Sequence, residues 1–385
     1  MKENPLRELG TLGQSVWLDF ISRAMIQSGE LRKMIEEDGL RGLTSNPDIF
    51  DKAISESTDY DEEIRALALA GKTDEEIYEE LTAEDIQMAA DLFRPVYGKL
   101  DGRDGFVSLE VSPRLARDTE GTIAEARRLW KAVDRPNVLI KVPATMEGLP
   151  AIRKLVAEGI NINVTLLFGL PRYRLVAEAY IAGLEDRSGN GKPLEHIASV
   201  ASFFLSRIDV LVDPMLEKIT DAGGRDAELA ESLKGKVAIA CAKIATEIHR
   251  EVFSGKRFDA LASRGAHDQR LLWASTGTKN PSYSDVKYVE PLIGAGTINT
   301  MPLKTLKAYS EHGDPAHRLR EGLRESRRIL TSLDGLGIDL DKVTRQLEVE
   351  GVDKFIRPFD NLMYTLKKKR FAVLAETGTC RKALP

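Results

Sequence analysis

The chain has 385 residues, 42% hydrophobic and 30% charged, and a formal net charge of −5 at pH 7. This composition is ordinary for a soluble globular protein, and the mild negative charge gives no reason to expect nucleic acid or an anionic membrane as a partner. The first residues lack an apolar signal core and no apolar stretch is long enough to span a bilayer, so we expect a cytoplasmic protein. The two cysteines, Cys241 and Cys380, are too few and too far apart for a disulfide framework or a cysteine metal site.

Short apolar segments alternate with longer amphipathic segments along most of the chain. The apolar segments are residues 15–20, 40–46, 105–112, 137–145, 162–168, 197–205, 270–276 and 297–303. Helix-like stretches such as 119–133 and 146–159 lie between them. The alternation predicts a parallel sheet with helical crossovers. Eight strands fit a closed (β/α)₈ barrel better than a doubly wound sheet, although the second and eighth segments show the strand pattern least clearly.

Two further regions are predicted to be helical additions to a single barrel domain spanning residues 1–385. Residues 51–104 are mostly helix-like and too long for one crossover, and residues 340–385 read as a helical extension that folds back over the barrel. The doubly wound alternative depends on "IGAGTIN" (293–299), which has asparagine in place of the third glycine. It also lacks the strand–turn–helix context of a dinucleotide-binding motif.

Polar residues occupy one face of the predicted strands. Side chains alternate between the two faces of a strand, and in six of the predicted strands one face is apolar while the other carries polar residues. The residues on these second faces include Asp19, Glu110, Lys141, Asn163 with Thr165, Ser202, and Ser275 with Trp273. We expect the polar faces to point into the barrel near the carboxyl ends of the strands, where barrel enzymes build their sites. This assigns Leu166, Leu272 and Ala274 to the helix side. A register error of one residue would exchange the two faces.

Lys141 is the most unusual of these residues, because it stands in the apolar segment "NVLIKVPAT" (137–145). Burial disfavours the ammonium form, and a free amine can attack a carbonyl to form a Schiff base, an electron sink for C–C bond chemistry. The alternative is a structural lysine that reaches water at the strand end or pairs with a carboxylate. Asp19 and Glu110 are the interior carboxyl groups available as proton carriers.

Other residues fit a sugar-like substrate with an anionic group. Thr165 is placed to help Glu110 hold a water, and Asn46 and Asn163 are placed to bind hydroxyl groups. No metal is expected, because the histidines are scattered (196, 249, 267, 312 and 317). No cofactor is expected either.

Two cations follow the sixth and seventh strands. Arg207 and Lys279 would suit a phosphate at the mouth of the barrel. The alternative for Arg207 is a weak surface ion pair with Asp209.

The motifs "LTSNP", "VSLEVSPRLARDT", "LIKVPAT.EG", "GININVTLLF" and "RLLWASTGTKNP", in this order, resemble those of the transaldolases, in particular the long bacterial branch. The resemblance covers residues from about 15 to 310. It implies a (β/α)₈ barrel that transfers a dihydroxyacetone unit through a lysine Schiff base in the non-oxidative pentose phosphate pathway. The donor would be sedoheptulose 7-phosphate or fructose 6-phosphate, and the acceptor glyceraldehyde 3-phosphate or erythrose 4-phosphate.

The resemblance also implies roles for individual residues. Lys141 would be the Schiff-base lysine and Asp19 the acid/base of C–C cleavage, while Glu110 and Thr165 would position the water of imine formation. Substrate contacts would come from Asn46, Asn163, Ser202, Phe204, Arg207 and Ser275. One departure is "STGTKN", in which Lys279 stands further along than the family's better-known arginine and would bind phosphate as a point charge.

Two other functions fit the same residues. A fructose 6-phosphate aldolase-type enzyme would release the donor fragment, but within the resemblance Glu110 and Phe204 favour the transferase, since the aldolase relatives have glutamine and tyrosine there. A non-catalytic sugar-phosphate-binding barrel would have no need of the complete Asp19, Glu110 and Lys141 set. We expect small sugar phosphates as partners and a monomer or homodimer.

Overall fold

The computed structural model describes residues 4–376 and forms a closed barrel of eight parallel strands that pair in sequential order. The strands are β1 (Ser15–Asp19), β2 (Gly42–Thr44), β3 (Phe106–Glu110), β4 (Val138–Pro143), β5 (Ile162–Leu167), β6 (Ser199–Phe204), β7 (Arg270–Ala274) and β8 (Ile298–Met301). Each lies within a predicted segment, including the short second and eighth ones. The predicted (β/α)₈ barrel is therefore confirmed and the doubly wound alternative is wrong. Cys380 lies outside the described residues.

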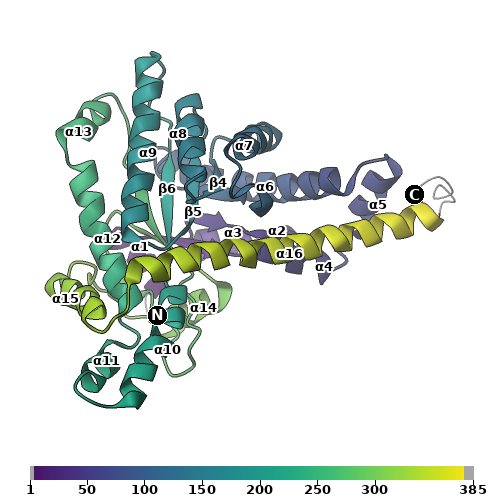
Figure 1. The fold of residues 1–385 in the computed structure, drawn as a ribbon. Coiled ribbons are helices and arrows are strands. Elements are labelled where there is room, and N and C mark those ends of the chain that lie inside the picture. Colours follow the sequence, from purple (N-terminus) through teal and green to yellow (C-terminus); the bar gives the residue numbers. More distant parts are fainter. Residues whose placement is uncertain (1–3, 377–385) are drawn as a thin grey trace.

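Helices surround the barrel and connect its strands (Figure 1). The α-helices before β6 are α1 (Pro5–Thr11), α2 (Arg23–Gln27), α3 (Glu30–Glu37), α4 (Pro47–Ser55), α5 (Asp61–Leu69), α6 (Asp74–Lys99), α7 (Thr119–Val133), α8 (Gly148–Glu158) and α9 (Leu170–Gly189). Those after β6 are α10 (Ser206–Ala222), α11 (Ala227–Leu233), α12 (Val237–Phe253), α13 (Lys256–Ala262), α14 (Leu303–His312), α15 (Leu323–Gly335) and α16 (Leu340–Glu376). Short 3₁₀ turns occur at η1 (Pro113–Leu115) and η2 (Glu290–Leu292). Between residues 4 and 376, no helix combines the length and apolar character needed to cross a membrane.

The additions to the barrel are the helices α4, α5 and α6 between β2 and β3, and the final helix α16. Figure 1 shows α16, in yellow, passing from α15 across the barrel and on alongside α5 and α6, with which it is in contact. Asn46 caps α4 by accepting a hydrogen bond from the backbone N–H of Ile49 at 3.1 Å, and Pro47 begins the helix. A capping box formed by Thr73 and Glu76 starts α6. Both helices therefore begin at capped residues, α4 at the barrel mouth and α6 beside the far part of α16, where Asp74 pairs with Arg370.

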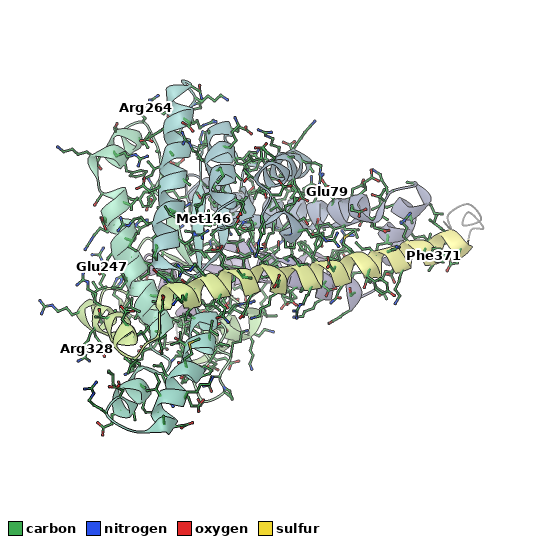
Figure 2. All side chains as sticks on the ribbon, in the orientation of Figure 1. Glu79, Met146, Glu247, Arg264, Arg328 and Phe371 are labelled. Atoms are coloured by element: carbon green, nitrogen blue, oxygen red, sulfur yellow. The ribbon has the colours of Figure 1, made fainter. Side chains whose placement is uncertain are left out.

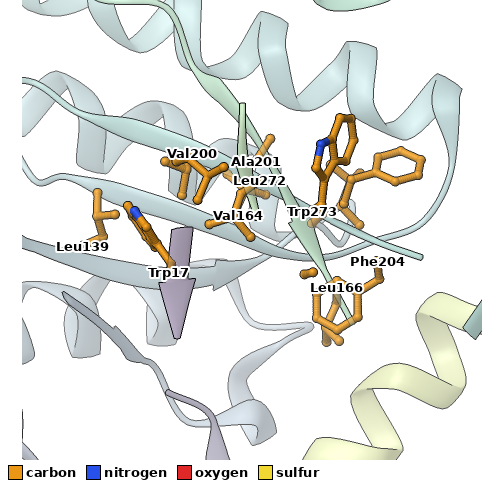
Figure 3. Close-up of a cluster of buried hydrophobic side chains, with 14 of the residues drawn as sticks. Trp17, Leu139, Val164, Leu166, Val200, Ala201, Phe204, Leu272 and Trp273 are labelled. Carbon is orange, nitrogen blue, oxygen red and sulfur yellow. The ribbon is translucent and has the colours of Figure 1, made fainter. Parts of the chain in front are cut away.

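The amino-terminal half of the barrel interior is filled by large apolar side chains. Trp17 of β1 is fully buried beside Gly42 of β2, and its indole N–H donates to Asp104 at 2.7 Å. Figure 3 shows Trp17, Leu139 and Val200 at one end of the buried cluster, and Phe204 near the ribbon of α16 at the other. The interior is therefore closed at one end and can open only at the other.

Gly42 is expected to be essential for this packing. A Cβ added at Gly42 would overlap the rigid indole of Trp17, so we expect Gly42→Ala to destabilise the protein by about 1–3 kcal/mol. Gly98 of α6 offers a matched control, because a Cβ there meets nothing within 4 Å and alanine gains helix propensity. Thermal and urea unfolding midpoints should fall for Gly42→Ala and stay level or rise for Gly98→Ala. Equal midpoints for Gly42→Ala and the parent chain would contradict this packing.

The predicted faces of the seventh strand are wrong. In the register of β6 and β7, Leu272 pairs with Ser202 and Ala274 with Phe204, whereas Trp273 pairs with Phe203. Since paired residues in a parallel ladder share a face, Leu272 and Ala274 point into the barrel and Trp273 points toward the helices. The indole of Trp273 is therefore fully buried between the barrel and the helices that surround it.

At the ends of two strands, a residue with a left-handed backbone conformation also interrupts the alternation of side-chain directions. Ser275 has φ 54°, which returns its side chain to the barrel mouth although Trp273 faces outward. Leu166 has φ 55°, at a register shift between β5 and β6. Its side chain approaches Gly351 of α16 and does not continue the outer face that was predicted for it.

Candidate active site

A cavity of about 580 Å³ lies at the carboxyl ends of the strands. Nine of the predicted site residues line it: Asp19, Asn46, Lys141, Thr165, Ser202, Phe204, Arg207, Ser275 and Lys279. Glu110 and Asn163 are not part of this wall, but each contacts a residue that is: Glu110 contacts Lys141, and Asn163 contacts Ser202. A second cavity, of about 490 Å³, lies at the amino-terminal ends of the strands near His249 and Asp268 and contains none of the predicted residues.

Lys141 is buried on the inner face of β4, and its side chain is 5% exposed. Its Nζ lies 2.9 Å from Oε2 of Glu110 and donates to the backbone carbonyl of Ser45 at 2.9 Å. The parallel register of β3 and β4, which pairs Glu110 with Lys141, brings the two side chains together. The lysine therefore does pair with a carboxylate, as the structural alternative held, but the pair stands at the wall of the cavity.

Desolvation raises the pKa of both interior carboxyl groups above the ordinary range. For Glu110 the nearby Lys141 acts in the opposite direction, and the charge of Asp19 adds to the rise. For Asp19, Lys141 again opposes the rise, as does a 2.7 Å hydrogen bond that Thr44 donates to its Oδ1. Two carboxyl groups that hold protons more readily than usual are suited to proton transfer near the amine.

Glu110 and Thr165 both present polar atoms that are available to a ligand. Oε1 of Glu110 and the hydroxyl of Thr165 are buried and have no hydrogen-bond partner among residues 4–376. Thr165 lines the cavity, and its strand β5 neighbours the strand of Lys141. Buried polar groups normally have partners, so these two atoms fit a bound water or a substrate group.

Asn163 and Asn46, the predicted hydroxyl-binding residues, are placed differently. Asn163 is fully buried, donates to Ser108 at 3.0 Å and accepts from Ser202 at 2.6 Å. It therefore orients Ser202, which does line the cavity. Asn46 lines the cavity itself; its Oδ1 caps α4, which leaves its amide N–H groups for a ligand.

Arg207, Ser275 and Lys279 gather at the side of the cavity where α10 begins. Within the described residues, neither Arg207 nor Lys279 forms an ion pair or a hydrogen bond with another side chain. Ser275 is tied to the first residue of α10, because the hydroxyl groups of Ser206 and Ser275 lie 3.0 Å apart. Free cations beside a helix N-terminus favour an anionic ligand.

The alternative role for Arg207 is wrong. Asp209 is 1% exposed and accepts hydrogen bonds from the backbone N–H of Ala238 at 2.8 Å and from Tyr288 at 2.9 Å. It is therefore not the surface partner of Arg207.

The sequence reasoning missed five charged or aromatic cavity residues: Phe20, Asp48, Lys52, Lys354 and Phe355. Asp48 and Lys52 pair with each other at 2.7 Å on α4. Their segment "SNPDIFDK" follows a predicted strand end, which was a usable signal. Lys354 and Phe355 come from α16, far along the chain, and no local pattern indicated that they reach the cavity.

Comparison with known proteins agrees with this geometry. The sequence profile of the transaldolase/fructose-6-phosphate aldolase family matches residues 16–366. The chain belongs to this family. A transaldolase of Trichodesmium erythraeum (strain IMS101) is 49% identical over 375 residues, 96% of this chain and 98% of the relative. A transaldolase of Saccharopolyspora erythraea is 50% identical over 94% of this chain and 97% of its own length.

A third relative from a different organism is equally similar. The transaldolase of Thermobifida fusca (strain YX) is 49% identical over 94% of this chain and 96% of its own length. These matches confirm three predictions: the family, that the protein is an enzyme, and that its function is that of a transaldolase, which is a transferase. The family profile covers both transaldolases and fructose-6-phosphate aldolases, but these three relatives all carry the transaldolase name.

Proposed function

We propose that this protein transfers a dihydroxyacetone unit from a ketose phosphate to an aldose phosphate through an imine on Lys141. The observation that carries the proposal is the position of the Lys141 amine, which lies 2.9 Å from Glu110 in the wall of a cavity that Asp19 also lines. The amine is the nucleophile, and the two acids are proton carriers. The closed barrel floor limits access to the mouth.

Imine formation would use Glu110, Thr165 and Lys141. Glu110 lies within hydrogen-bond distance of the amine, and desolvation raises its pKa, so its carboxylate is suited to accept the proton that the amine gives up as it attacks C2 of the ketose. The carbinol hydroxyl then leaves as water when the carboxyl group returns its proton. The hydroxyl of Thr165 would hold this water in place.

Cleavage of the C3–C4 bond would use Asp19. As a carboxylate it accepts the proton of the C4 hydroxyl while the electron pair of the bond moves into the imine. The aldose phosphate leaves and a three-carbon enamine remains on Lys141. An incoming aldose phosphate then reverses the sequence: its aldehyde carbon bonds to C3, and its oxygen takes the proton from Asp19.

Binding of the phosphate is assigned to Arg207, Ser275 and Lys279. Arg207 stands at the second residue of α10, so its guanidinium and the helix N-terminus can act on the same anion. Lys279 is exposed at the rim and would act as a point charge. The cytoplasmic location and the monomeric or homodimeric state expected from the sequence stay predictions.

Borohydride trapping tests the proposal. Fructose 6-phosphate with borohydride should add covalent mass to the peptide that contains Lys141, because reduction fixes the imine. The internal control is the peptide that contains Lys243, which should stay unmodified. Lys243 is a buried lysine of α12 whose amine donates hydrogen bonds to two backbone carbonyls.

The outcome separates the alternative functions. Addition of erythrose 4-phosphate should yield sedoheptulose 7-phosphate if the enzyme is a transferase. Release of dihydroxyacetone without transfer would indicate the aldolase-type enzyme. No adduct at all would indicate a non-catalytic binding protein and would reject the proposal.

A further inference from the structure

The final helix, α16, forms part of the wall of the cavity. Lys354 and Phe355 both line it, and Phe355 is 4% exposed. The ring of Phe355 lies 5.9 Å from the Nζ of Lys141 and 6.5 Å from the ring of Phe204, measured to ring centroids. One side chain from the end of the chain therefore stands directly over the amine at the centre of the site.

Contacts on both sides of Phe355 fix this part of α16 to the barrel. Before it in sequence, Glu348 pairs with Arg172 at 3.2 Å, and Arg172 also donates to the carbonyl of Ala144, just after the strand of Lys141. After it, Asp360 pairs with Arg114 at 2.6 Å, in the turn that follows the strand of Glu110. The helix is thus attached to the loops of the two strands that carry the reacting pair.

Close packing brings the helix itself near the barrel. Gly351 is buried, and a Cβ there would lie 3.2 Å from the side chain of Leu166 at the end of β5. The ring centroids of Phe168 and Phe204 lie 5.3 Å apart, with the rings tilted by 56°, and the two side chains continue the apolar layer to Phe355. The result is an aromatic cover over the inner part of a cavity whose rim is charged.

We infer that Phe355 shields C3 of the enamine from solvent and so sets the ratio of transfer to hydrolysis; this inference rests on the proposed function. After cleavage, the three-carbon enamine on Lys141 has two fates. It can bond to an acceptor aldehyde, which is transfer. It can instead take up a proton at C3, after which water adds across C=N, dihydroxyacetone leaves and the amine of Lys141 is regenerated. Uptake of a proton from solvent at C3 occurs only in the second fate, whereas water must hydrolyse the imine on Lys141 to release the product in both. Shielding of C3 from solvent therefore slows the second fate selectively.

The test compares full-length variants in two assays with fructose 6-phosphate. One assay contains erythrose 4-phosphate and measures sedoheptulose 7-phosphate. The other contains no acceptor and measures dihydroxyacetone. We expect Phe355→Ala to raise the ratio of hydrolysis to transfer by about tenfold, and Phe355→Leu to raise it less, because leucine refills part of the volume.

A matched control lies on the same helix. Phe371 is 52% exposed near the far end of α16, as Figure 2 shows, so Phe371→Ala removes an identical side chain away from the cavity. Its ratio should equal that of the parent protein. A purely structural role for Phe355 would lower both rates together and leave the ratio unchanged.

The outcomes distinguish this inference from the proposed function. If Phe355→Ala forms the Lys141 adduct but keeps the parent ratio within about twofold, the inference is rejected and the function stands. If the parent protein forms no adduct, the function itself fails. If Phe355→Ala does not fold, the Phe355→Leu ratio decides, and a ratio equal to that of the parent rejects the inference.

Discussion

Replacement of Lys141 by methionine or alanine is expected to abolish adduct formation and to lower turnover by more than about 10⁴-fold. No other lysine among residues 4–376 combines burial with a place in the cavity, so no second amine can form the imine. Methionine is the preferred replacement, because it keeps the length of the side chain in a packed wall. Mass spectrometry after borohydride treatment and a coupled turnover assay measure the two effects.

The control for this prediction is Lys243→Met. Lys243 is buried like Lys141, but its Nζ donates to the carbonyls of Arg318 and Glu321 on the outside of the barrel. Its loss should affect stability and leave trapping on Lys141 intact. More than trace turnover in a folded Lys141→Met protein would overturn the assignment of the nucleophile.

Asp19→Ala is expected to separate the two chemical steps. The variant keeps the Lys141–Glu110 pair, so it should still form the borohydride-trapped adduct. It lacks the group that accepts the C4 hydroxyl proton, and we expect kcat for transfer to fall by about 10²–10⁴-fold. Loss of trapping as well as turnover would show that Asp19 also acts in imine formation and that the division of roles is wrong.

The pH dependence gives a second measurement on the same residue. Cleavage requires Asp19 as a carboxylate, and desolvation raises its pKa above the ordinary value of about 3.9. Activity should therefore decline on acidification at a higher pH than for an exposed aspartate. Because Glu110 titrates in the same cavity, the acid limb belongs to the two groups together, and it should change position in Asp19→Ala.

Much of the barrel and the centre of the site could be predicted from the sequence. The strand segments are bounded by helix-like stretches, and a polar residue at every second position of an apolar strand marks its inner face. This rule located Asp19, Glu110 and Lys141, since each lies inside its strand. The structure brings Lys141 and Glu110 into contact and places Lys141 and Asp19 on the same cavity.

The inner face of β7, the side-chain directions at two strand ends and the position of α16 could not be predicted from the alternation of polar and apolar residues. Both faces of a strand in this fold are buried, so an apolar strand such as β7 gives no sign of which face is inner. The left-handed conformations of Leu166 and Ser275 change side-chain direction at a single residue and have no glycine to signal them. The docking of α16 is set by Arg114 and Arg172, more than 170 residues earlier in the chain.

The order of the elements has a consequence for how the protein is made. Every predicted catalytic and substrate-binding residue precedes Leu340, whereas Phe355, which stands over Lys141, belongs to α16, the last described helix. During translation all of these site residues are therefore synthesised before α16, the helix that carries Phe355. A chain that stopped just before Leu340 would carry all of these residues but would lack Phe355, so the amine of Lys141 would be exposed to solvent.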